Sequence, residues 1–122
     1  MTLKATCHCG AARITVPHLP EKATACTCTF CTKRGVQWGY YQPDEVIIEA
    51  DDCGRDYAPS GMNHHHFCGH CGCSTWSKTP DWTNMDETGE NPPERIAVNL
   101  WRIDDSDVRA LPIELLDGRN QW

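Results

Sequence analysis

Short stretches in which apolar and polar residues alternate run along most of the chain, separated by glycine, proline and aspartate. Such alternation predicts β-strands that bury one face. The strands expected on this pattern lie within residues 11–16, 35–41, 45–50 and 95–103, with two more around a Cys-Gly turn in 64–77 and a last one in the tail 112–122. The pattern therefore predicts a mainly β protein of short antiparallel strands with little helix.

The segments between these strands are rich in turn-forming residues. We expect turns at 17–23 and 51–56, and a long polar loop with three prolines at 78–94. The acidic cluster that opens residues 104–111 can cap a single helical turn. The chain has 122 residues and no internal repeat, so we expect one domain over residues 1–122 with a modest core.

Composition and charge exclude several classes of protein. Hydrophobic residues make up 39% of the chain and charged residues 23%, which is ordinary for a globular protein. The formal charge of −6 argues against a nucleic-acid-binding surface, which usually has a basic excess. No apolar run reaches the roughly 18 residues of a membrane span, and the N-terminal residues show no apolar signal segment. We therefore expect a cytoplasmic protein that binds neither nucleic acid nor membrane.

The nine cysteines are the most informative feature of the composition. They comprise the pair Cys7 and Cys9, the triplet Cys26, Cys28 and Cys31, the pair Cys68 and Cys71 with Cys73 two residues on, and the isolated Cys53. The odd number and the tight Cys-x-Cys spacing are poor for disulfides. In a reducing compartment such clusters more often bind metal.

Two of the clusters have the arrangement of a closed structural zinc site. Such a site takes four ligands in a tetrahedron, commonly as two close pairs from distant segments. Cys7 and Cys9 form one pair, and Cys68 and Cys71 form the other. A glycine follows each pair and lets the backbone turn so that its amides can point at the sulfurs.

Cys26, Cys28 and Cys31 then remain as a set of three, which is one ligand short of a closed site. Three protein ligands and one open position are typical of a catalytic zinc. A zinc ion with three thiolates has a net charge of −1, so it is a weak Lewis acid, and it suits the binding and deprotonation of an incoming thiol. Lys33 and Arg34 follow the triplet directly and could compensate the negative charge.

Two other arrangements of the thiols remain open from the sequence. Cys73, a histidine or a water molecule could complete the three-cysteine site and make it purely structural. Alternatively, Cys7 and Cys9 could pair with Cys26 and Cys28.

The motifs that contain these cysteines resemble a known family. They are CHCGAARITV, ACTCTFC followed by KRG, HHFCGHCGCSTW, IAVNLWRIDD and LPIELLDGRNQW, in that order from about residue 3 to residue 122. The chain resembles the glutathione-dependent formaldehyde-activating enzymes, whose domain is shared with centromere protein V.

This resemblance implies a fold, two metal sites and an activity. The fold would be the mainly β, tent-like zinc fold of the Mss4-like superfamily. Cys7, Cys9, Cys68 and Cys71 would match the structural zinc ligands, and Cys26, Cys28 and Cys31 those of a second, catalytic zinc. The activity would be the reversible condensation of glutathione with formaldehyde, a carbon–sulfur lyase reaction in which the thiol binds at the open zinc position.

Two rival functions remain open beside this one. The chain could be a non-catalytic zinc-stapled β module that binds a partner. It could also be a zinc-containing thiol redox enzyme, for which Cys53 or Cys73 would have to supply a reactive thiol outside the zinc sites.

Further residues attract interest without a motif to support a role. On a strand, His64 and His66 would share one face and His65 would take the other, where one histidine could approach the open zinc position. Alternatively, all three histidines form a polar strand edge and have no role in metal binding.

More than one interpretation is also possible for the aromatic residues and for Cys53 and Cys73. Trp38, Tyr40 and Tyr41 could line a pocket, although aromatic residues on an alternating strand are more often core. We expect Trp76 and Trp101 in the core and Cys53 as a free surface thiol. Cys73 could be a buried small residue or a thiol within reach of either zinc.

Overall fold

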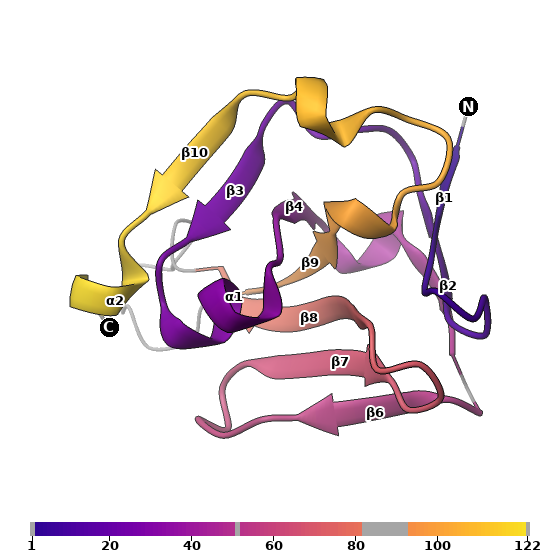
Figure 1. Ribbon diagram of the computed structural model, residues 1–122, viewed down its shortest axis with the longest axis horizontal. Coiled ribbons are helices and arrows are strands. Elements are labelled where there is room, and N and C mark those ends of the chain that lie inside the picture. The colour runs from indigo at the N-terminus through magenta and orange to yellow at the C-terminus, as the bar shows by residue number, and fades with distance from the viewer. Residues whose placement is uncertain (1, 51, 82–92, 122) are drawn as a thin grey trace.

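The computed structural model describes residues 2–50, 52–81 and 93–121, which form ten strands in two sheets (Figure 1). The smaller sheet is antiparallel in the order β1-β2-β5 and consists of β1 (Leu3–Thr6), β2 (Arg13–Val16) and β5 (Ile47–Glu49). Its strands run side by side at one end of the molecule. The prediction of a mainly β fold is confirmed.

The larger sheet has seven strands in the order β10-β3-β4-β9-β8-β7-β6. The strands are β3 (Ala23–Cys26), β4 (Trp38–Tyr41), β6 (Gly54–Tyr57), β7 (His64–Cys68), β8 (Ser74–Pro80), β9 (Glu94–Asn99) and β10 (Ile113–Leu116). A single residue pair, Thr24 with Trp38, joins β3 to β4. At this junction the β10–β3 pair leans away from the other strands (Figure 1).

The expectation of antiparallel strands is wrong for one pair. β10 runs parallel to β3, with Ile113 opposite Ala23 and Leu116 opposite Cys26. Parallel pairing requires a long crossover rather than a hairpin. Here almost the whole chain lies between the two strands, so local sequence patterns do not reveal their pairing.

The described residues also include five short helical segments, of which four lie between strands and the last follows β10. They are α1 (Thr29–Arg34), α2 (Gly118–Gln121) and the 3₁₀ turns η1 (Pro43–Glu45), η3 (Leu100–Arg102) and η4 (Val108–Ala110). The turn η4 confirms the helical turn expected in residues 104–111. In the described parts of the chain, no helix has the length and apolar character needed to cross a membrane.

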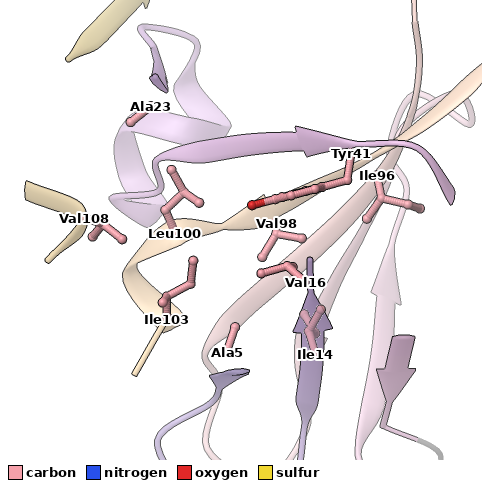
Figure 2. Packing of buried hydrophobic residues seen from close by; sticks show 10 residues of the cluster. All are labelled: Ala5, Ile14, Val16, Ala23, Tyr41, Ile96, Val98, Leu100, Ile103 and Val108. Atoms are coloured by element: carbon pink, nitrogen blue, oxygen red, sulfur yellow. The ribbon is translucent and has the colours of Figure 1, made fainter. Parts of the chain in front are cut away.

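The main hydrophobic core lies between the two sheets (Figure 2). Ala5, Ile14 and Val16 from the smaller sheet face side chains of the larger sheet, among them Val98. Tyr41 also lies in this core, and its hydroxyl donates a hydrogen bond of 2.7 Å to the carbonyl of His18. The alternation of the chain therefore buries one face of each sheet, as the sequence predicted.

Several local expectations differ from the structure. Residues 51–56 were expected to form a turn. Instead, Gly54–Tyr57 form β6, an exposed strand at the edge of the larger sheet that pairs with β7 along its whole length. The strand expected at 95–103 ends at Asn99, whose side chain accepts a hydrogen bond from the amide of Trp101 and starts a 3₁₀ turn.

That turn directs Trp101 outward. Its side chain is 40% exposed, so its expected place in the core is wrong, whereas Trp76 packs against the core. The polar loop expected at 78–94 is shortened by β8, which extends to Pro80. Residues 82–92, including Trp82, lie outside the described residues.

Candidate metal centres

Four thiols from two distant segments meet at one end of the molecule. The sulfurs of Cys7, Cys9, Cys68 and Cys71 all lie within 4.8 Å of one another. The Sγ–Sγ distance is 3.6 Å between Cys7 and Cys9 and 3.7 Å between Cys9 and Cys68. A disulfide would be about 2.05 Å long. A tetrahedral zinc with Zn–S bonds of about 2.3 Å separates its sulfurs by roughly 3.8 Å, so the spacing fits four ligands of one ion.

Two glycine turns present these sulfurs. Gly10 and Gly72 have φ angles of +81° and +82°, a left-handed conformation that residues with a Cβ rarely adopt. Each turn is closed by a backbone hydrogen bond, from the Gly10 amide to the Cys7 carbonyl at 3.0 Å and from the Gly72 amide to the Cys68 carbonyl at 2.8 Å. The glycine after each cysteine pair therefore lets the backbone turn, as the sequence suggested.

Backbone amides favour the ionised form of these thiols. The amide of Ala12 donates to Cys7 Sγ at 3.3 Å, and the amide of His70 donates to Cys68 Sγ at 3.4 Å. The amides of Cys73 and Cys9 lower the pKa of Cys71 to about 5. Burial opposes the ionisation of Cys68, but nearby amides outweigh it and lower its pKa. Against the effect of the Ala11 amide, burial and the neighbouring thiols raise the pKa of Cys9 to about 12. Full ionisation of the cluster therefore calls for a cation, and thiolates are the form that metals bind.

Cys53 and Cys73 pack beside this four-thiol cluster rather than elsewhere. Cys53 is 1% exposed, so the expectation of a surface thiol is wrong. Its side chain is buried in a cluster with Cys7, Ala12 and Cys68. The amide of Gly69 also donates a hydrogen bond of 2.7 Å to the Cys53 carbonyl, next to the start of β6. Burial and the neighbouring Cys68 raise the pKa of Cys53. A low-pKa thiol, as a redox enzyme needs, is therefore not found at Cys53.

The second cluster consists of the sulfurs of Cys26, Cys28 and Cys31, which lie within 4.8 Å of one another. All three come from the end of β3 and the start of α1. Cys28 is the N-cap of α1, and its sulfur accepts a hydrogen bond of 3.4 Å from the Cys31 amide. The helix ends after Arg34 because Gly35 takes a left-handed conformation, with φ of +65°. No fourth ligand side chain joins the three among the residues that the structure describes.

Hydrogen-bond donors also surround these sulfurs. The Cys28 amide donates to Cys26 Sγ at 3.4 Å, and the indole Nε1–H of Trp38 donates to Cys31 Sγ at 3.3 Å. Burial opposes the ionisation of Cys28, but the Cys31 amide and the thiols of Cys31 and Cys26 outweigh it and lower its pKa. Burial raises the pKa of Cys26 and, against the effect of Trp38, that of Cys31. Of the three thiols, Cys28 therefore ionises most readily. All three become thiolates together only beside a cation, so the donor set fits a metal ion.

The three-thiol cluster rests on one face of the larger sheet. Cys31 packs with Val36, Trp38 and Ala97 in a small apolar cluster, and Phe30 and Tyr40 pack against it. Trp38 and Tyr40 therefore border the thiols, whereas Tyr41, on the opposite face of β4, belongs to the main core. Trp38 is both a buried residue and a direct hydrogen-bond donor, a role that the sequence did not indicate.

The three histidines of β7 have separate environments. His64 Nδ1 lies 3.0 Å from a carboxylate oxygen of Asp56, and the His66 ring stacks on Trp76 with centroids 3.8 Å apart. His65 lies on the other face, as expected for alternation along a strand. In the described part of the chain, none of them joins a group of metal-ligand atoms.

His65 contacts the helix that carries the three-thiol cluster. Its ring stacks on Phe30 with centroids 3.8 Å apart, and its Nδ1 lies 2.8 Å from Ser77 Oγ. Burial and the cation of Arg34 lower its pKa to about 4. His65 is therefore neutral at neutral pH and supports α1 by stacking.

The two basic residues expected to compensate thiolate charge lie at the end of α1. The guanidinium of Arg34 lies over the rings of Phe30, Tyr57 and Phe67, at 4.9, 5.6 and 5.9 Å from their centroids. Lys33 is exposed. Arg34 thus contacts aromatic rings, and the donors that directly contact the sulfurs are amides and an indole.

Two surface hollows have no cysteine in their lining. One of about 270 Å³ lies between the sheets and is lined by Ile48, Ala50, Gly54, Arg55, Asp56, His66 and Trp76. The other, of about 380 Å³, is a shallow depression lined by Trp101 and residues 103–109. Neither is lined by a cysteine, so the chemistry of the thiols, and not the size of a hollow, identifies the candidate site.

Comparison with known proteins agrees with this geometry. The model of the glutathione-dependent formaldehyde-activating enzyme family matches residues 2–90. The chain belongs to this family. A relative from Halomonas elongata, which carries the same enzyme name provisionally, is 28% identical over 120 residues that cover 82% of this chain and 76% of the relative.

A solved structure also shares the fold of this family member. The crystal structure of a Rhodobacter sphaeroides protein superposes with a TM-score of 0.68 and 26% sequence identity, and the match covers 92% of this chain and 100% of that one. The fold and family expected from the cysteine motifs are thus confirmed.

Proposed function

We propose that this protein is a zinc-dependent enzyme that activates a small thiol, glutathione or a similar one, for reversible addition to formaldehyde or another small aldehyde. The reaction belongs to the carbon–sulfur lyases. Membership of the glutathione-dependent formaldehyde-activating family supports the substrates. The two thiol clusters support the metal. A reducing compartment such as the cytoplasm would keep the thiols available.

The two clusters would have different roles. Cys7, Cys9, Cys68 and Cys71 would hold a structural zinc, and Cys26, Cys28 and Cys31 a second zinc at the reactive site. A metal held by these three residues would have an open coordination position and would lower the pKa of a thiol that binds there. The reaction forms the S–C bond to the aldehyde carbon, converts the C=O group to C–OH, and leaves the proton of the thiol on that oxygen.

The residues around the three-thiol cluster suit this reaction. The Cys31 amide, the Cys28 amide and the Trp38 indole donate hydrogen bonds to sulfur and disperse the negative charge. Val36, Trp38 and Ala97 pack on Cys31 and limit water around the inner side of the cluster. These contacts fix the three sulfurs before a substrate arrives, which is the requirement for a preorganised site.

One observation carries the proposal. Four sulfurs gather in one cluster, whereas the other has only three among the described residues. A site with three protein ligands leaves room for a substrate, and a site with four does not. The same difference weakens the idea of a purely structural module, in which both sites would be closed.

Exchange spectroscopy by NMR tests the proposal. Formaldehyde and glutathione combine without a catalyst, so the measurement is the rate at which the adduct exchanges with free thiol, with and without protein at equal pH. We expect zinc-loaded protein to accelerate the exchange in both directions. Protein with two zinc ions per chain and no acceleration, for glutathione or for simpler thiols, would contradict the proposal.

A further inference from the structure

The sheet face that carries the three-thiol cluster continues onto β8 and β9. Ala97 packs with this cluster and lies opposite Tyr40 on β4 and Ser77 on β8. Two residues further along, Arg95 lies opposite Thr79. Alternate residues of a strand share a face, so Arg95 and Thr79 lie on this same face, one row beyond Tyr40.

Arg95 and Thr79 both carry buried polar atoms without a partner. Arg95 Nε and Thr79 Oγ1 are shielded from solvent and make no hydrogen bond within the described structure. Buried donors and acceptors are nearly always paired, and an unpaired one costs free energy. Two such atoms on directly paired residues therefore indicate a place for a ligand with a hydrogen-bond acceptor.

The other contacts of Arg95 hold its guanidinium in place. Its Cζ lies 3.7 Å from the centroid of the Tyr40 ring, and Nη1 lies 3.8 Å from Asp81 Oδ1. The nearby Glu94 forms an ion pair of 2.9 Å with Lys78, and both project to the opposite face because they alternate with Arg95 and Thr79. The Arg95 side chain is 23% exposed, so part of it faces solvent, whereas Nε itself is shielded.

Tyr40 links this position to the thiols. It packs against the three-thiol cluster and also lies under Arg95. Burial raises the pKa of Tyr40 to about 12, with Arg95 lowering it and the thiols of Cys31 and Cys26 raising it. Rows of residues on one face are roughly 7 Å apart along a strand. A molecule with its sulfur at the cluster and a carboxylate a few bonds away spans this distance.

We propose that Arg95 and Thr79 anchor a carboxylate of the thiol substrate, and that this anchor makes the enzyme select acidic thiols over neutral ones. The inference rests on the proposed function, because it assigns the substrate class of the same site. An arginine N–H and a hydroxyl match the acceptor oxygens of a carboxylate. Asp81, at the other end of the guanidinium, orients it without occupying Nε.

Two thiols that differ only in charge test this anchor. 3-Mercaptopropionate and 3-mercaptopropionamide have the same chain length, and their exchange with formaldehyde is followed by NMR on the zinc-loaded protein. We expect kcat/KM to be roughly 10- to 100-fold higher for the carboxylate. In Arg95→Met, which keeps an aliphatic chain over Tyr40, we expect this preference to disappear, mainly through a lower kcat/KM for the carboxylate.

Two further variants make the test specific. Thr79→Val replaces a hydroxyl by a methyl group of the same size, so it keeps the fold, and we expect it to reduce the preference by several-fold. Lys78→Met removes one positive charge from the neighbouring position on the opposite face and should leave the preference unchanged.

The outcomes separate the two proposals. Equal acceleration of both thiols by the wild-type protein overturns the anchor and leaves the proposed function standing. A preference that survives in Arg95→Met and Thr79→Val also overturns it. No acceleration of either thiol contradicts the proposed function, and the anchor falls with it.

Discussion

The two thiol clusters contain the same chemical group but differ in which segments of the chain they join. The four-thiol cluster joins residues that are 59 positions apart in the sequence, Cys9 and Cys68, and so ties the N-terminal strand region to β7 and β8. The three-thiol cluster takes all its sulfurs from residues 26–31, so it joins no distant segments. A metal at the first cluster would hold the fold together, and a metal at the second would add little to it.

The supports of the two clusters differ in the same way. The four-thiol cluster depends on glycine turns and backbone amides, and Cys68 is fully buried. The three-thiol cluster caps a helix and lies on a sheet face beside aromatic and polar side chains. The number of sulfurs and their separation in the sequence together would therefore distinguish a stabilising site from a reactive one.

The largest effect is expected at the four-thiol cluster. Cys68→Ser should remove a buried ligand and lower the free energy of unfolding by roughly 3 kcal/mol or more, because metal binding is coupled to folding in small domains. Thermal unfolding and zinc content measure this. Cys73→Ser is the matched control in the same turn, and it should cost only about 1 kcal/mol. Equal costs for the two variants would contradict the assignment.

The same substitution at the three-thiol cluster should act on activity instead. Cys28→Ser should reduce thiol–aldehyde exchange at least ~100-fold, while the free energy of unfolding changes by about 1 kcal/mol or less. Serine is a good N-cap, so the start of α1 is preserved. The measurement is the NMR exchange rate alongside a melting curve. If Cys28→Ser unfolds as Cys68→Ser does, the two clusters are alike and both are structural.

A smaller effect is expected from the indole donor. Trp38→Phe keeps an aromatic ring but removes the hydrogen bond to Cys31 Sγ. Loss of such an outer contact should weaken zinc at the three-thiol cluster by roughly 10-fold, with the four-thiol cluster unchanged. Competition with a chelator resolves the two affinities. A loss at both clusters would show that Trp38 acts through the fold in general.

The smallest effect concerns pH and His65. Its pKa in the folded protein is about 4, below the ordinary 6.5, because burial and Arg34 oppose the proton. The unfolded chain therefore binds the extra proton first as pH falls, and stability is lost from about pH 6.5 down to about 4. His65 is partly exposed, so screening limits this loss to the order of 1 kcal/mol.

A difference measurement isolates this contribution. His65→Gln removes the titrating group, and the stability of the variant relative to the wild-type protein should rise as pH falls from 6.5 to 4. Subtraction cancels the protonation of the cysteines, which both proteins share. Parallel stability profiles for the two proteins would contradict the expected role of burial at His65.

The sequence predicted the thiol clusters better than their surroundings. Cysteine spacing is local, so the two groups could be predicted from the chain. The alternation in residues 95–103 indicated a strand, which the structure has as β9. Cys53 was misplaced because its burial comes from packing in a cluster with residues distant in the sequence, among them Cys7 and Cys68. Local sequence carries no sign of that packing.

Other features were hidden for related reasons. Helix α1 was not expected, since its first four residues, 29–32, are weak helix formers, and the thiol of Cys28 caps it. The parallel pairing of β10 with β3 joins residues about 90 positions apart, as with Leu116 and Cys26. The anchor at Arg95 could be suspected only once the cross-strand neighbour Thr79 was known.

Zinc per chain, measured by elemental analysis on the wild-type protein and on Cys28→Ser, tests the division of seven thiols into two unlike sites most directly. The account predicts two zinc ions in the wild-type protein and one in a folded Cys28→Ser. A single zinc in both proteins would contradict it, since the three-thiol cluster would then hold no metal.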